Sequence, residues 1–151
     1  TLTTGVAVSA VAALGEEIGF RGLLFHEWYS LGFWRISLLT GAIWGVWRIP
    51  LLLQYPHVTS TDLFMFLSLY ILASPLFTLI RLKSQSIAAT AVLHGSLNAS
   101  AVFMTAFVRD PNMLHIVVVG SAGIVAFAIA QSGIRGGLRP APYPWNPSDR
   151  C

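Results

Sequence analysis

Long apolar runs separated by short polar links make up most of the chain. Five runs stand out, at residues 2–29, 34–54, 63–82, 87–108 and 113–134. Each has the roughly 20 residues that a helix needs to cross a bilayer, and the links carry Gly, Pro, Ser or charged residues. Because the runs lack the strict alternation of β-strands, the pattern predicts an all-α fold, a polytopic transmembrane helical bundle of about five spans.

The composition supports lipid as the solvent. Hydrophobic residues make up 55% of the chain, charged residues only 10%, and the mean hydropathy is +0.69. A soluble domain carries about 25% charged residues. The basic residues are scattered, which argues against a nucleic-acid partner, and the single Cys151 excludes an internal disulfide framework.

The positions of the basic residues predict the orientation of the bundle. One side would hold Arg35, Arg81, Lys83, Arg135, Arg139 and Arg150, against Arg109 alone on the other. By the positive-inside rule, the C-terminus is expected in the cytoplasm. We expect a transmembrane domain at residues 1–135 and a flexible cytoplasmic tail at 136–151. Since the sequence opens at Thr1 without Met, we also expect further spans upstream.

Ionisable residues interrupt three of the runs, at a cost of about 2.5–3.5 kcal/mol for each charge in lipid. The ionisable residues are Glu16, Glu17 and Arg21 in the first run, Arg48 in the second and His94 in the fourth. The fourth run also carries an amide, Asn98. Glu17 and Arg21 are four residues apart and share a helix face, while Glu16 points about 100° away. The three runs bring these residues to overlapping depths, which predicts a shared, water-accessible cavity.

This cluster has the chemistry to hydrolyse an amide. A buried carboxylate beside an imidazole can take a proton from water. An imidazole and an amide on one helix face, as in His94 and Asn98, can donate hydrogen bonds to a developing oxyanion.

Three short motifs resemble those of one known family, the CPBP family of CAAX-processing and bacteriocin-processing intramembrane proteases. This family is also called the Abi family and includes the type II CAAX prenyl proteases. Its EExxxR motif is matched by residues 16–22 (EEIGFRG), its FxxxH motif by residues 44–50 (WGVWRIP) and its HxxxN motif by residues 94–98 (HGSLN). The motifs occur in the family's order within residues 6–108.

The resemblance implies an intramembrane endopeptidase in a bacterial or archaeal plasma membrane, acting on a membrane-embedded or prenylated peptide. Glu16 would be the base that activates water. Glu17 and Arg21 would be a supporting pair, and His94 and Asn98 would hold the oxyanion or position the water.

Arg48 departs from the family, which has histidine at this position, and Trp44 replaces the motif's phenylalanine. Arginine neither accepts a proton nor ligates a metal, and Arg48 is expected to pair with Glu16 and weaken it as a base. Glu16 and His94 alone fall short of the three protein ligands of a catalytic zinc site. The sequence therefore predicts no metal and no cofactor.

Other interpretations of the cluster remain open at this point. The charged residues would also suit a structural ion network, and His94 and Asn98 would suit hydrogen bonding between helices. A pseudoprotease that binds a membrane peptide without cutting it is the main alternative to the enzyme. A transporter or channel is less favoured, because the runs lack paired broken helices.

Overall fold

The computed structural model describes residues 2–54, 56–105 and 111–132. Its elements are α1 (Leu2–Glu17), the π-helix η1 (Ile18–Leu24), α2 (Phe25–Glu27), the 3₁₀-helix η2 (Tyr29–Leu31), α3 (Phe33–Leu52), α4 (Ser60–Ser84), α5 (Ile87–Thr105) and α6 (Pro111–Gln131). These ranges contain helices and no strand, which confirms the all-α prediction. The proposed tail at 136–151 lies outside the described residues, so the division into two segments stays a prediction.

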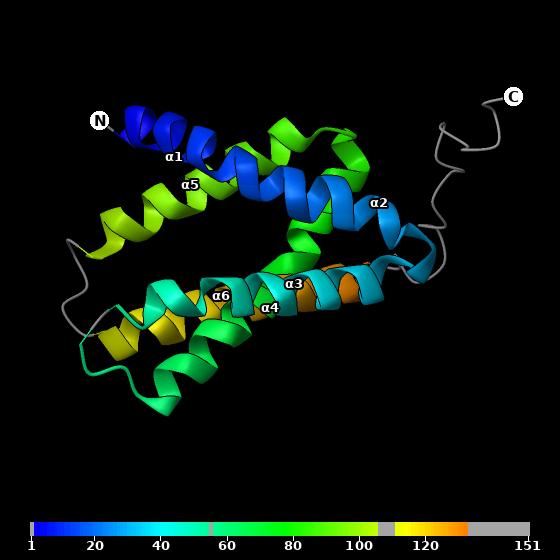
Figure 1. Cartoon of the computed structure of the whole chain (residues 1–151). Coiled ribbons are helices and arrows are strands. Elements are labelled where there is room, and N and C mark those ends of the chain that lie inside the picture. Colours follow the sequence, from blue (N-terminus) through cyan, green and yellow to red (C-terminus); the bar gives the residue numbers. More distant parts are fainter. Residues whose placement is uncertain (1, 55, 106–110, 133–151) are drawn as a thin grey trace, which may run out of the picture.

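The helices form two neighbouring groups (Figure 1). α1 lies along α5, while α3 packs against α4, which also contacts α6. α4 runs obliquely and contacts α5, and thereby joins the groups. The links from α2 to α3 and from α4 to α5 lie at the same end of the bundle. The sequence places Arg35 and Lys83 at this end.

The helices differ in how well they meet the requirements of a membrane span. By length and composition α4 is the one described helix that qualifies, with a mean hydropathy of 2.1 over its best window. Shorter apolar helical segments cover Ile87–Val102 and Val117–Gln131. Large apolar side chains also point outward, with Val11, Trp47 and Ile124 each at least 67% exposed. An outward apolar surface suits lipid, but the number of spans stays a prediction.

Small residues allow α3 and α4 to approach closely. A Cβ atom added to Gly41 would lie 2.8 Å from Ser74 Cβ and 2.9 Å from the backbone of Tyr70 and Ile71. Gly45, one turn further along α3, would meet Leu67 Cδ2 at 3.0 Å. Glycine is therefore required at Gly41 for this helix spacing, the usual role of small residues between membrane helices.

A π-helix follows directly after Glu16 and Glu17. In η1 the turns are wider than in an α-helix, and the Phe25 N–H donates to the carbonyl of Phe20, five residues earlier. Stretches of π-helix are rare and occur often at functional sites. Here η1 carries Arg21, the last residue of the predicted EExxxR motif.

Candidate active site

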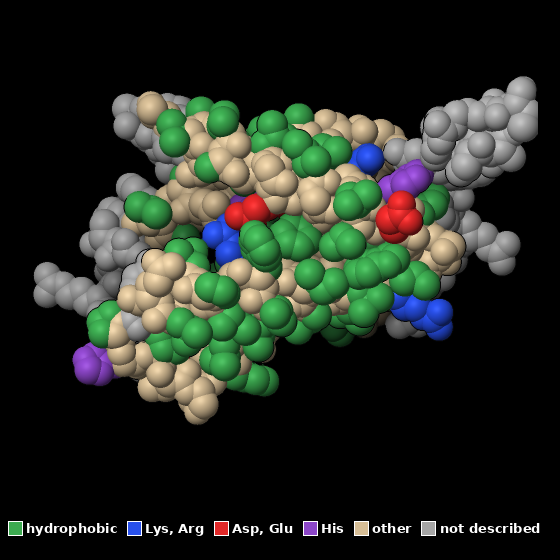
Figure 2. Space-filling view, in the orientation of Figure 1, with side chains coloured by type: hydrophobic (Ala, Val, Ile, Leu, Met, Phe, Trp, Pro, Cys, Tyr) green, Lys and Arg blue, Asp and Glu red, His purple; other side chains and the backbone are tan. Residues whose placement is uncertain are grey.

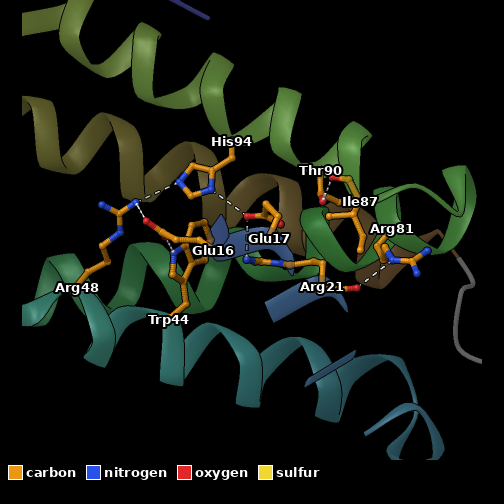
Figure 3. A network of polar contacts seen from close by, with 9 residues as sticks. All are labelled: Glu16, Glu17, Arg21, Trp44, Arg48, Arg81, Ile87, Thr90 and His94. Carbon is orange, nitrogen blue, oxygen red and sulfur yellow. Dashed lines mark hydrogen bonds and ion pairs between the residues drawn. The ribbon is translucent and has the colours of Figure 1, made fainter. Parts of the chain in front are cut away.

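Glu17, at the end of α1, is the centre of a buried polar group (Figure 3). Its Oε1 atom lies 3.2 Å from Arg21 Nη1 and 2.9 Å from His94 Nδ1. The three side chains are at most 2% exposed. They come from α1, η1 and α5, so this contact ties the first helical segment to α5.

Glu16 makes a second, more accessible group with α3. Arg48 Nη2 lies 2.8 Å from Glu16 Oε1, and the Trp44 indole N–H donates to Glu16 Oε2 at 3.0 Å. The same Arg48 nitrogen lies 3.3 Å from His94 Nε2. Arg48 therefore bridges the carboxylate and the imidazole (Figure 3).

The contacts of His94 determine where its proton resides. A guanidinium can only donate hydrogen bonds, so His94 Nε2 must accept from Arg48. The proton is then on Nδ1, which donates to Glu17 Oε1. In this arrangement the Nε2 lone pair of His94 is directed towards Arg48, next to Glu16.

Aromatic rings surround the inner ion pair. The Arg21 guanidinium carbon lies 4.3 Å from the centre of the Trp44 ring and 4.5 Å from that of Phe77. The His94 ring contacts the same two rings edge to face. Cation–π attraction of this kind is worth about 2 kcal/mol or more away from water, and it holds Arg21 in the apolar core.

The outer group is open to the surroundings. Glu16 lines a pocket of about 270 Å³ together with Gly15, Gly19, Phe20 and Trp47. The Glu16 and Arg48 side chains are 24% and 18% exposed. In Figure 2 a group of acidic, basic and histidine atoms lies in a hollow between apolar side chains, and a second group of charged and histidine atoms lies near one end of the same face. Glu16 is therefore the more accessible of the two glutamates.

Comparison with known proteins assigns the chain to a family. The sequence pattern of the type II CAAX prenyl endopeptidase Rce1-like family matches residues 1–100, about two thirds of the chain. The chain belongs to this family. The match spans all three motifs and confirms the resemblance to CAAX-processing proteases. No curated protein and no solved structure matches the chain.

Five of the six residues predicted for the site lie together in this member of the type II CAAX prenyl endopeptidase Rce1-like family. The predicted pairs, Glu17 with Arg21 and Glu16 with Arg48, are both confirmed. Asn98, one turn beyond His94 on α5, is half-buried and makes no hydrogen bond to another described residue. The catalytic roles of all six stay predictions.

The sequence did not predict two contacts of this Rce1-like site. Trp44 donates a hydrogen bond to Glu16, which the phenylalanine of the family motif could not do. Arg81, assigned from sequence only to the topology of the chain, is buried and bonds to the backbone of Arg21. Among the described residues, no group of three His, Cys, Asp or Glu side chains is close enough to hold a metal ion.

Proposed function

We propose that the chain is an intramembrane endopeptidase that hydrolyses a peptide bond of a prenylated or membrane-embedded peptide with water activated by Glu16. The observation that carries the proposal is the position of Glu16. Glu16 lines a pocket, and its carboxylate contacts the same Arg48 nitrogen as the His94 imidazole, whose Nδ1 bonds to Glu17. An oriented imidazole beside an accessible carboxylate is suited to general base chemistry.

The contacts suggest a division of roles. Glu16 takes a proton from water as the water oxygen bonds to the peptide carbonyl carbon. Because His94 presents a lone pair at Nε2, it is suited to accept the second hydrogen bond of that water. When the C–N bond breaks, Glu16 passes its proton to the leaving nitrogen.

Arg48 must leave Glu16 for this reaction to occur. It would then become a donor to the oxyanion, alongside Asn98. A donor aimed at a developing oxyanion typically contributes a factor of about 10²–10³ in rate. In this scheme the guanidinium replaces the family's histidine with a different function, since it cannot act as a base.

The ion pair between Arg48 and Glu16 favours a second candidate function. At 2.8 Å the guanidinium neutralises the proposed base and lies where a water would bind. A site closed in this way would suit a pseudoprotease that binds a prenylated or membrane peptide without cutting it.

The proposal includes placement in a bacterial or archaeal plasma membrane, with several helices spanning the bilayer and the C-terminus in the cytoplasm. It is supported by the apolar outer surface, by the family and by the shared end of the bundle at which Arg35 and Lys83 lie. Lipid would be the permanent partner of the outer surface, and a peptide or prenylated protein the transient one.

A peptide-cleavage assay in liposomes tests both candidates. It compares wild type, Glu16→Gln, Arg48→His and the control Glu27→Gln, which alters an exposed carboxylate outside the polar group. The endopeptidase proposal expects cleavage by wild type and by Glu27→Gln, with at least a hundredfold loss in Glu16→Gln. Cleavage unaffected by Glu16→Gln contradicts the proposal. Activity found only in Arg48→His establishes the pseudoprotease.

A further inference from the structure

Arg81 is a buried arginine outside the three sequence motifs. It lies in the last turn of α4 and is 7% exposed. Its Nε–H donates to the backbone carbonyl of Arg21 at 3.0 Å, and its guanidinium lies 5.3 Å from the centre of the Phe25 ring. Burying a charge this far from solvent is costly unless the charge is paired and hydrogen-bonded.

The bond from Arg81 reaches the middle of the π-helix. Such a helix is less favourable than an α-helix and persists where other contacts compensate. Arg21 is held at both of its ends: Arg81 binds its carbonyl, while Glu17 and the flanking aromatic rings hold its guanidinium. The bond therefore fixes the backbone that carries the partner of Glu17.

Glu17 passes this constraint to His94. One oxygen, Glu17 Oε1, contacts both Arg21 and the Nδ1–H of His94. A shift of Arg21 would draw this oxygen away from the imidazole and remove the bond that keeps its proton on Nδ1. Without that bond the proton could move to Nε2, which would then no longer be a hydrogen-bond acceptor facing Glu16 and Arg48.

We propose that Arg81 is a positioning residue, which holds the π-helix through the Arg21 carbonyl and thereby fixes the tautomer and orientation of His94. Its effect on cleavage rests on the proposed function, but its effect on His94 does not. Arg81 lies on the far side of Arg21 from His94 in Figure 3, so it acts through other residues and not on a substrate.

Nitrogen NMR of histidine-labelled protein in detergent tests the proposal directly, because the two neutral tautomers of imidazole give different nitrogen signals. The spectrum of a His94→Gln variant identifies the His94 signals. Arg81→Met removes the donor, and Arg81→Lys keeps the charge but replaces Nε–H and the planar group. Lys83→Met is the matched control, since Lys83 is in the same turn of α4 but exposed.

We expect both Arg81 variants to convert part of the His94 signal to the Nε2–H form and Lys83→Met to leave it unchanged. In the cleavage assay, kcat should fall by ~10- to 100-fold in the Arg81 variants with little change in KM. If Arg81→Met does not stay monodisperse in detergent, Arg81→Lys decides.

An unchanged His94 signal in a folded Arg81 variant would overturn the proposal, as would an equal change in Lys83→Met. If wild type cleaves no peptide, the proposed function fails while the NMR result still decides the role of Arg81.

Discussion

Replacing Glu17 by glutamine tests whether the inner polar group holds the helices together. Glu17→Gln keeps the size of the side chain and an oxygen that can accept from Arg21 and His94, but it removes the negative charge. Arg21 is 1% exposed and a guanidinium does not lose its proton in proteins. The variant therefore leaves an uncompensated positive charge in the core.

The structure sets the expected magnitude. Breaking a buried ion pair by removing one partner costs about 3–5 kcal/mol. The contacts of Arg21 with Trp44 and Phe77, at 4.3 and 4.5 Å, remain in the variant and limit the loss. We therefore expect the free energy of unfolding to fall by about 3 kcal/mol, at the lower end of that range. Glu16→Gln, in a pair 18–24% exposed, should cost less than Glu17→Gln because water partly screens the charge left on Arg48.

The assay is reversible unfolding in mixed micelles of a mild detergent and sodium dodecyl sulfate, with wild type, Glu17→Gln, Glu16→Gln and the double variant Glu17→Gln/Arg21→Met. Because the double variant removes both charges, it should lose less stability than Glu17→Gln alone. The reasoning is refuted if Glu17→Gln costs no more than Glu16→Gln, or if the double variant loses at least as much stability as Glu17→Gln alone.

Three further substitutions test the packing and polar contacts around the site by the same unfolding assay. Gly41→Ala should cost about 1–3 kcal/mol because the new Cβ meets α4 at 2.8 Å, whereas Gly120→Ala, with nothing within 4 Å, should cost nothing; equal losses would contradict the close packing. Trp44→Phe removes the donor to Glu16, a hydrogen bond worth about 1.5 kcal/mol; that part of the loss should vanish in a Glu16→Ala background, while the cost of the smaller buried ring remains. Thr59→Ala removes the capping box that begins α4 and should cost about 1 kcal/mol; no measurable loss would show that the cap is unimportant.

The sequence predicted the contacts that depend on helix periodicity. Apolar runs of spanning length correspond to the long helices, and the four-residue spacing placed Glu17 with Arg21. Arg48 was assigned to Glu16 because opposite charges at similar depth in an apolar medium must meet. These contacts follow from local geometry and the cost of an unpaired charge.

The remaining contacts depend on the tertiary structure. Residues 18–24 carry no pattern that predicts a π-helix, and the Arg81 bond to the Arg21 carbonyl comes from α4, which is distant in sequence. Arg81 is two residues before Lys83 in the sequence, and both suit a cytoplasmic link. Arg81 is buried and Lys83 is exposed because the two residues lie on different faces of the last turn of α4. The tautomer of His94 likewise cannot be predicted from the sequence, because it depends on the partners of both ring nitrogens.

Arg48 links the stability of the site to its chemistry. Two carboxylates, Glu16 and Glu17, pair with two guanidinium groups, Arg48 and Arg21, so the charges of the two ion pairs balance. With a neutral histidine at position 48, as in the family motif, one negative charge would be left over in an apolar surrounding. The guanidinium removes that excess, and the 2.8 Å contact that does so also occupies one of the acceptor positions of the Glu16 carboxylate. Arg48→His should therefore lower the stability of the bundle whether or not it raises the rate of cleavage, because the balance of charge and the freedom of the base depend on the same bond.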